Sequence, residues 1–154
     1  MMYVDTSVFV KYYSEERTEK GAEKMKGLID DAKKDKETLL SSVLLIGESV
    51  SVFDKWLRLN RITKDGLDKA TGKFILDIKE LTESGNLVLE PISAFNSLFS
   101  VDYILKHHLT VNDALHLYAA LTRKDKIDSF VCSDKNLIKA AETEGLVIMN
   151  PEEM

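Results

Sequence analysis

The sequence is poor in residues that break, cross-link or anchor a chain. Its 154 residues include one cysteine, two prolines and seven glycines. The single cysteine, Cys132, excludes a disulfide within the chain and fits a reducing cytosol; we expect it to be a small buried side chain. The scarcity of proline and glycine argues against linkers and favours long helices. We expect one domain over residues 1–154, because this length suits one well-cored domain and is short for two.

Long hydrophobic runs and basic excess are also missing. No stretch approaches the roughly 18 apolar residues that a membrane-spanning helix needs. The opening MMYVDTSVFV contains neither a basic leader nor an apolar core of useful length. We therefore expect a soluble, cytoplasmic protein without a membrane partner. The net charge of −5 argues against a surface that coats nucleic acid broadly, but it does not exclude a nuclease.

Short apolar segments alternate with segments of helical periodicity along the chain. Strands are expected at residues 2–5, 38–41, 87–89, 129–132 and 146–149. Helices are expected over residues 6–13, 15–35, 43–59, 64–82, 93–107, 112–123 and 136–142. Strands separated by helices predict an α/β fold with a parallel sheet covered on both faces. The long middle stretch without strands predicts a helical arm.

Four carboxylates lie where a strand gives way to a helix, or in the first turns of a helix: Asp5, Glu48, Asp113 and Asp134. The carboxyl ends of parallel strands share one edge of a sheet, where ligands bind, so these residues should converge there. Like charges at close range need compensation, and hard oxygen ligands suit Mg²⁺ or Mn²⁺. Phosphodiester hydrolysis uses a carboxylate-held metal, and the sequence therefore predicts a metal-dependent nuclease.

Each of these carboxylates also has a purely structural interpretation. Asp5, Asp113 and Asp134 stand beside hydroxyl residues at helix starts, where helix capping alone would explain them one at a time. Glu48 lies inside a helix and on its own would be a surface residue. Capping does not explain why a carboxylate recurs after unrelated strands.

Basic residues and histidines are further candidates for a role at this site. Candidates for phosphate contacts are Lys55, Arg58, Arg61 and Lys135, for which ordinary surface solvation is the alternative. His107 and His108 are adjacent and therefore lie on different helix faces. For His116, in an apolar helix, we expect a packed or surface role.

Four segments occur in the order MYVDTSVFVKYYSEE, SSVLLIGESVSVF, LTVNDALHLYAAL and FVCSDKNLIKAAETEGLVIMNP. Their order and spacing resemble the PIN-domain family, especially its VapC-like toxin ribonucleases. The resemblance implies a three-layer α/β/α sandwich with a central parallel sheet and a helical arm. It also implies that the four carboxylates bind Mg²⁺ or Mn²⁺ and are catalytic, with Thr6, Ser7 and Ser133 supporting them through water. Tyr118 is a departure, since an alanine is common at its position, and we expect it to alter core packing only.

The same resemblance implies an endoribonuclease that hydrolyses RNA as the toxin of a toxin-antitoxin pair. Its implied partners are an RNA substrate, a small antitoxin-like protein and a second copy of the chain. The alternative is a non-catalytic PIN-like module that binds RNA or protein. A haloacid-dehalogenase-type phosphatase ranks low, because its second Asp would stand at position 7, where the chain has Ser7. A phosphoacceptor receiver domain would need an acidic pair beside a central Asp and a lysine at a strand end, and the chain shows neither arrangement cleanly.

Overall fold

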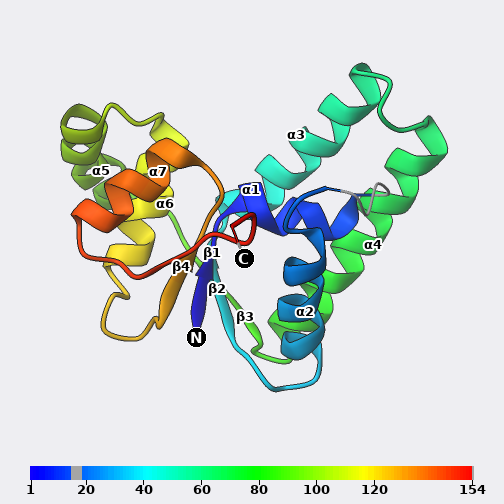
Figure 1. Cartoon of the computed structure of the whole chain (residues 1–154), viewed down its shortest axis with the longest axis horizontal. Coiled ribbons are helices and arrows are strands. Elements are labelled where there is room, and N and C mark those ends of the chain that lie inside the picture. The colour runs from blue at the N-terminus through cyan, green and yellow to red at the C-terminus, as the bar shows by residue number, and fades with distance from the viewer. Residues whose placement is uncertain (15–18, 154) are drawn as a thin grey trace.

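A computed structural model of the chain describes residues 1–14 and 19–153. At its centre is a five-stranded parallel sheet in the order β3-β2-β1-β4-β5 (Figure 1). The strands are β1 (Met2–Val4), β2 (Leu39–Ser42), β3 (Leu87–Glu90), β4 (Ser129–Val131) and β5 (Ile148–Met149). In the register of the sheet, Tyr3 of β1 pairs with Leu40 of β2 and with Phe130 of β4. The first strand of the chain is therefore the central one.

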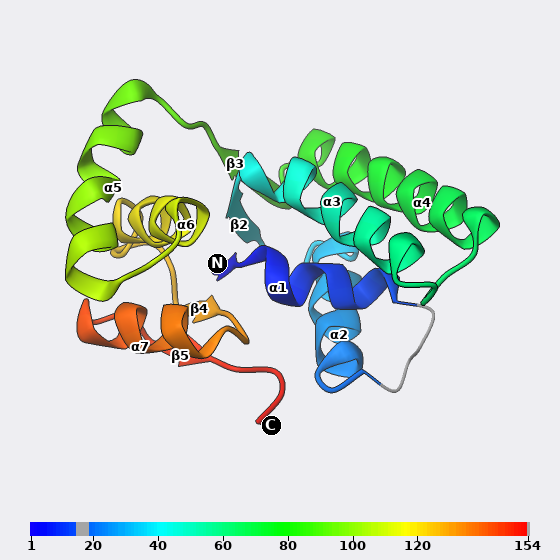
Figure 2. The same ribbon diagram turned by 90° about the horizontal axis from the view of Figure 1, so that it is seen from above.

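Helices cover both faces of this sheet (Figures 1 and 2). One face carries α1 (Thr6–Phe9), the 3₁₀ helix η1 (Val10–Tyr13), α2 (Ala22–Lys33), α3 (Leu44–Arg58) and α4 (Lys64–Glu83). The other face carries α5 (Ala94–His107), α6 (Val111–Leu121) and α7 (Lys135–Thr143). The predicted three-layer α/β/α sandwich is confirmed. Helices α3 and α4 run side by side and extend beyond the sheet as the helical arm (Figure 2).

Two elements depart most from their predicted bounds, and a left-handed glycine accompanies each difference. The helix predicted over residues 15–35 begins at Ala22, directly after Gly21 at φ 87°; residues 15–18 lie outside the described part. The strand predicted over 146–149 is confined to Ile148–Met149. Leu146 instead completes the end of α7, since its N–H donates to Ala141 after Gly145 at φ 80°. Glycine adopts this backbone region without steric cost, and so it ends or delays a regular element.

Alternation along the strands supplies two separate hydrophobic cores. Successive strand residues point to opposite faces of the sheet. The core beneath α1–α4 takes Val4, Leu39, Leu87 and Val131, all buried. The core beneath α5–α7 takes Tyr3, Leu40, Phe130 and Cys132, which is buried as predicted. None of the helices within the described ranges is long and apolar enough to cross a membrane.

A buried ionic contact fastens the arm to the rest of the fold. Asp77 of α4 is 5% exposed. Its carboxylate accepts a hydrogen bond from Lys33 Nζ at 2.6 Å and another from the Tyr13 hydroxyl at 3.0 Å. These bonds join α4 to α2 and to η1. Beside them, Phe74 packs edge to face against Tyr13 and Phe53, so the base of the arm combines apolar packing with a satisfied polar contact.

We expect Asp77→Ala to lower the free energy of unfolding by about 1–3 kcal/mol, because it leaves the Tyr13 hydroxyl and Lys33 without their acceptor. Denaturant unfolding followed by circular dichroism measures this change. Asp68→Ala is the matched control, since Asp68 pairs with Lys64 on the exposed surface of the same helix and such pairs contribute little. Equal losses in the two variants would contradict a specific role for the buried contact.

Candidate active site

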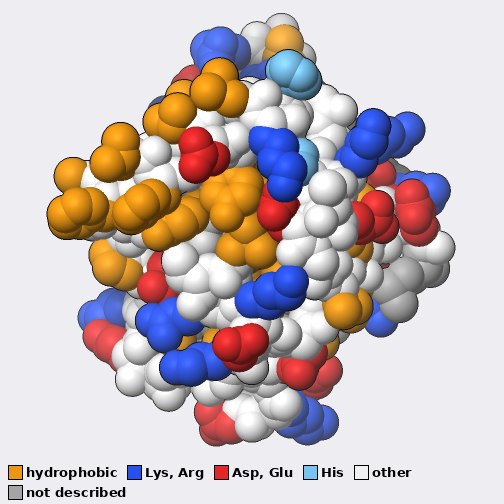
Figure 3. All heavy atoms as spheres, turned by 90° about the vertical axis from the view of Figure 1, so that its left-hand side faces the viewer, with side chains coloured by type: hydrophobic (Ala, Val, Ile, Leu, Met, Phe, Trp, Pro, Cys, Tyr) orange, Lys and Arg blue, Asp and Glu red, His pale blue; other side chains and the backbone are white. Residues whose placement is uncertain are grey.

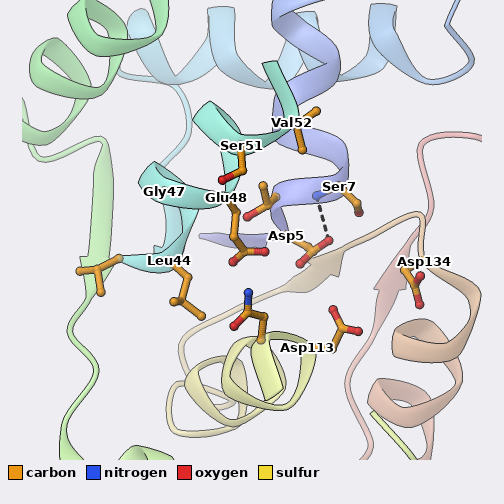
Figure 4. Close-up of a pocket in the computed structure, with 12 residues that line it drawn as sticks. Asp5, Ser7, Leu44, Gly47, Glu48, Ser51, Val52, Asp113 and Asp134 are labelled. Atoms are coloured by element: carbon orange, nitrogen blue, oxygen red, sulfur yellow. Dashed lines mark hydrogen bonds between the residues drawn. The ribbon is translucent and has the colours of Figure 1, made fainter. Parts of the chain in front are cut away.

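A pocket of about 720 Å³ opens at the carboxyl edge of the sheet. All four predicted carboxylates line it, although they come from four different elements (Figure 4). Asp5 follows β1, Glu48 lies in α3, Asp113 lies in α6 and Asp134 precedes α7. The hydroxyl residues Thr6 and Ser7 line the same pocket. The topology therefore brings together residues that are up to 129 positions apart in sequence, counted from Asp5 to Asp134.

Asp5 lies at the centre of the sheet and is 4% exposed. Its N–H donates to the Val131 carbonyl at 3.0 Å, which continues the pairing of β1 with β4. Its Oδ2 accepts the Ser7 N–H at 3.0 Å and so caps α1. The hydrogen bonds made to this carboxylate by described residues all end on Oδ2. Oδ1 has His116 Nε2 at 3.9 Å, beyond hydrogen-bond distance, and can still accept a ligand.

Asp134 and Asp113 lie at the amino ends of two of the helices on the other face, α7 and α6. Asp134 caps α7, because its Oδ1 accepts the Leu137 N–H at 2.9 Å. The cap of α6 is Thr110, whose hydroxyl accepts the N–H of Asp113 at 3.2 Å. The capping interpretation is thus correct for Asp5, and the hydroxyl residue near Asp113 is the cap of α6, whereas at α7 Asp134 itself is the cap rather than the neighbouring Ser133. Asp5 and Asp134 nevertheless also line the pocket. Capping uses one oxygen of each carboxylate and leaves the other.

The three aspartates act on one another electrostatically. Burial raises the pKa of Asp113, a hydrogen bond with Thr110 opposes this, and the charges of Asp5 and Asp134 raise the pKa further. Burial, followed by the charge of Asp5, raises the pKa of the Cys132 thiol far above its usual range. The thiol therefore stays protonated, and Cys132 is unsuited to act as a nucleophile.

His116 holds Glu48 in place through a buried chain of hydrogen bonds. The imidazole is fully buried, with Nε2 2.9 Å from Glu48 Oε1 and Nδ1 2.9 Å from the Tyr3 hydroxyl oxygen. Burial lowers the pKa of His116, but the hydrogen bond to Glu48 and the charges of the neighbouring carboxylates outweigh burial and raise it. Tyr3, beneath His116, has a pKa raised well above its usual range, first by burial, and remains a phenol.

Sequence reasoning missed His116 and Asn112 as parts of this site. Asn112 lines the pocket, and His116 contacts both Glu48 and, at 3.4 Å, the Thr6 hydroxyl. The signal was present, because His116 follows Asp113 by three residues and such residues share a helix face. Its position in an apolar stretch favoured a packed role, which is also correct.

The remaining predicted residues lie outside the pocket lining. The hydroxyl of Ser133 donates to Asn150 Oδ1 at 3.3 Å. Arg58 pairs with Asp54 at 2.8 Å, and Arg61 lies over the ring of Trp56. The other two are Lys55, near the end of α3, and Lys135, next to Asp134. Their contact with phosphate stays a prediction.

The donor set fits a hard divalent cation in chemistry and in charge. Four carboxylates from separate elements face one pocket, and each like charge raises the cost of ionising the next. Oxygen ligands of this kind are those that Mg²⁺ and Mn²⁺ prefer. In spacing the set is open: among residues 1–14 and 19–153, no three His, Cys, Asp or Glu side chains form a group tight enough to hold a metal ion. The carboxylates would have to move inward around a cation.

The comparison with protein families agrees with the fold and the site. The model of the PIN domain matches residues 2–143. The chain therefore belongs to the PIN-domain family, whose members are generally nucleases that use divalent metals. No curated protein matches the chain.

We expect Asp113→Asn to raise the melting temperature by a few degrees at about pH 7 in the presence of a chelator. The folded-state pKa of Asp113 is raised, so folding stability falls as pH rises through the ordinary carboxyl pKa and then the raised one. Asparagine removes this penalty, and the difference from wild type should vanish at about pH 3, where both side chains are neutral. Scanning calorimetry measures this difference in melting temperature. Glu142→Gln is the control, because Glu142 is an exposed carboxylate. A lower melting temperature for Asp113→Asn at neutral pH would contradict mutual repulsion in the pocket.

Proposed function

We propose that the protein is a metal-dependent endoribonuclease that hydrolyses phosphodiester bonds of RNA. The observation that carries this proposal is the convergence of Asp5, Glu48, Asp113 and Asp134 in one open pocket at the carboxyl edge of the sheet. Membership of the PIN-domain family supports it, because members of that family are generally nucleases. The proposed cofactor is Mg²⁺ or Mn²⁺, held by these four carboxylates. When bound, such a cation supplies an activated water and stabilises charge on the reacting phosphoryl group.

The side chains of the pocket have distinct proposed roles. Asp5 is the central ligand, because its Oδ2 is fixed by the Ser7 N–H while Oδ1 remains available. Glu48 is oriented by His116, whose buried position allows the imidazole little freedom. Asp113 and Asp134 close the opposite side of the pocket from α6 and α7. Thr6 and Ser7 offer hydroxyl groups that can position water beside the carboxylates.

One observation favours a second candidate function, a non-catalytic module that binds RNA or protein. The open spacing of the carboxylates, with no metal-holding group of three in the part of the chain that the structure describes, is what such a module would show. The two functions differ in turnover. A binding module retains RNA in the presence of Mn²⁺, whereas a nuclease cuts it and loses this activity on chelation.

We expect Asp5→Asn and Asp113→Asn each to reduce metal-dependent RNA cleavage by at least about 100-fold, the size of effect seen when one group that stabilises transition-state charge is removed. Both variants should fold, since asparagine is also a good N-cap at position 5 and the cap of α6 is Thr110, which Asp113→Asn leaves in place. Cleavage of a mixed-sequence single-stranded RNA is assayed with Mg²⁺ or Mn²⁺ and with chelator. In parallel, millimolar Mn²⁺ should raise the melting temperature of the wild type more than that of Asp5→Asn, because a ligand bound only by the folded state stabilises it.

Glu23→Gln and Glu142→Gln are the controls, because both carboxylates lie on exposed helix surfaces away from the pocket. They should cut RNA at the wild-type rate. The nuclease proposal is lost if the pocket variants cut as fast as these controls, or if the wild type cuts neither single-stranded nor structured RNA with either metal.

We further propose that the protein is a homodimer joined through α5. Within α5, which the structure describes in full, only Ser100 is buried. Its large apolar side chains are exposed instead, at 69% for Phe95, 63% for Leu98 and 69% for Leu105. Hydrophobic side chains gather across this face of the molecule (Figure 3). Exposed apolar area of this extent on one helix is typical of a protein interface.

A hollow of about 350 Å³ beside these residues favours a second copy as the occupant. Its aromatic lining is Phe99, Tyr103 and Tyr118, with Phe99 stacked on Tyr118 at 6.0 Å between ring centres. Tyr118 therefore shapes a surface hollow and is only half-buried, which differs from the core-packing role expected for it. A two-fold axis would place the apolar end of α5 of each copy against the hollow of the other, as an isologous interface requires.

We expect the double variant Phe95→Glu/Leu98→Glu to be monomeric at a concentration where the wild type is dimeric. Its melting temperature at low concentration should be close to that of the wild type, because both side chains are exposed within the protomer. Sedimentation velocity measures the assembly, with Leu76→Glu as control, since Leu76 is 67% exposed on α4. A wild type that stays monomeric at tens of micromolar would contradict the proposal.

The last part of the proposal is the biological role, the toxin of a toxin-antitoxin pair. Its support is the resemblance of the chain to VapC-like ribonucleases, and the implied partner is a small antitoxin-like protein. The pocket offers such a partner four carboxylates, which an arginine or lysine side chain could occupy by charge-assisted hydrogen bonds.

A further inference from the structure

A second polar pocket, of about 320 Å³, lies between the end of α5 and α7. Basic side chains line this pocket, whereas carboxylates line the pocket at the edge of the sheet. Four side chains of lysine or histidine line the second pocket: Lys106, His107, His108 and Lys139. Asn136 and Thr143 add an amide and a hydroxyl. No carboxylate lines it among the described residues, so an anion entering this pocket would meet donors on several sides.

Contacts around the pocket fix part of this lining and leave part available. Glu144 accepts from Lys106 Nζ at 2.6 Å and lies 2.6 Å from His107 Nε2. Those contacts with Lys106 and His107 lower the pKa of Glu144, which therefore stays ionised and offsets one positive charge. Lys139 is exposed and forms no ion pair with any residue in the described ranges. Its ammonium group is thus free to bind an anion.

The backbone at His108 adds an independent observation. His108 ends α5 in the left-handed conformation, at φ 54°. Glycine is the usual residue there, because any side chain adds a steric cost. The chain accepts this cost and places an imidazole at the edge of the pocket.

The two pockets are joined by α7. Asp134, the cap of that helix, lines the acidic pocket, whereas Asn136 and Lys139 line the basic one. A helix rises 1.5 Å per residue, so Lys139 lies about 8 Å along the axis from Asp134. A ligand that extends along α7 from one pocket to the other therefore needs a negative group at more than one point. The phosphate groups of a nucleic-acid strand meet this requirement.

We propose that the α5–α7 pocket binds a phosphate group of the RNA strand adjacent to the phosphodiester that is cut, with Lys139 and His108 as the main contacts. This inference rests on the proposed function and adds the path of the substrate to it. The physical need is clear, since four carboxylates and a net charge of −5 repel a polyanion. Phosphate contacts from lysine supply attraction and position the strand without reading its sequence.

The first experiment measures binding to a labelled single-stranded RNA in the Asp5→Asn background with chelator present, so that cutting does not interfere. Lys139→Gln should weaken binding about 3–10-fold at low salt and reduce the slope of log affinity against log salt by about 0.7, the value for one lost phosphate contact on a single strand. His108→Asn should also weaken binding. The variant should keep the fold, because asparagine tolerates the left-handed conformation at this position. Lys126→Gln is the matched control, because Lys126 is an exposed lysine in the turn between α6 and β4.

The second experiment uses substrate length in the otherwise wild-type enzyme. A dinucleotide carries one phosphodiester and cannot occupy both pockets. Lys139→Gln should leave its cleavage unchanged, while raising KM several-fold for a longer strand. Equal salt slopes for Lys139→Gln and Lys126→Gln, or equal KM effects on the short and long substrates, would overturn the inference.

The outcomes separate this inference from the proposed function. If the wild type binds RNA with a slope that depends on Lys139 but never cuts it, the nuclease proposal fails and the phosphate pocket stands. If the wild type cuts RNA and Lys139→Gln behaves as the Lys126→Gln control does, the nuclease proposal stands and the phosphate pocket is overturned. If the wild type instead binds an acidic protein partner through Lys139 and no RNA, both proposals are overturned.

Discussion

The buried hydrogen bonds of His116 are the interaction on which the site depends. This imidazole joins the Tyr3 hydroxyl in β1 to the Glu48 carboxylate in α3, and it is itself part of α6. The central strand β1 and one helix from each helical layer, α3 and α6, are therefore held together beneath the pocket. A fully buried imidazole without such partners would be costly. Because every nitrogen has a partner, the polar contact stabilises the arrangement and orients Glu48 at the same time.

Capping and ligand binding are compatible at this edge of the sheet, and the geometry explains why. A helix amino end carries unpaired N–H groups and a partial positive charge, which favours a carboxylate there. Asp5 and Asp134 each use one oxygen for that purpose. The same contacts fix the orientation of the second oxygen, so the structural role prepares the functional one. The cost appears in the raised pKa of Asp113, which burial raises first and the charges of Asp5 and Asp134 raise further.

Sequence alone predicted the layers, the order of elements and the four carboxylates of the pocket. These follow from local signals, namely strand alternation, helical periodicity and acidic residues at strand ends. The contact of Asp77 with α2, the buried role of His116 and the hollow beside Tyr118 were not predictable in this way. Each depends on which faces of distant helices meet, and periodicity gives a face of a helix without its neighbour. The late start of α2 after Gly21 reflects a single backbone torsion that a run of apolar residues does not reveal.

The net charge of the chain is a poor guide to what this surface attracts. Charges separated by more than about 10 Å are largely screened at moderate ionic strength. Lys139 follows Asp134 by roughly 8 Å along the axis of α7, so a ligand that extends along this helix meets both the acidic and the basic lining. An acidic pocket alone would attract cations and repel a strand. Under the proposed function, a bound cation would offset this repulsion, and the donors beside it would bind a neighbouring phosphate of the strand.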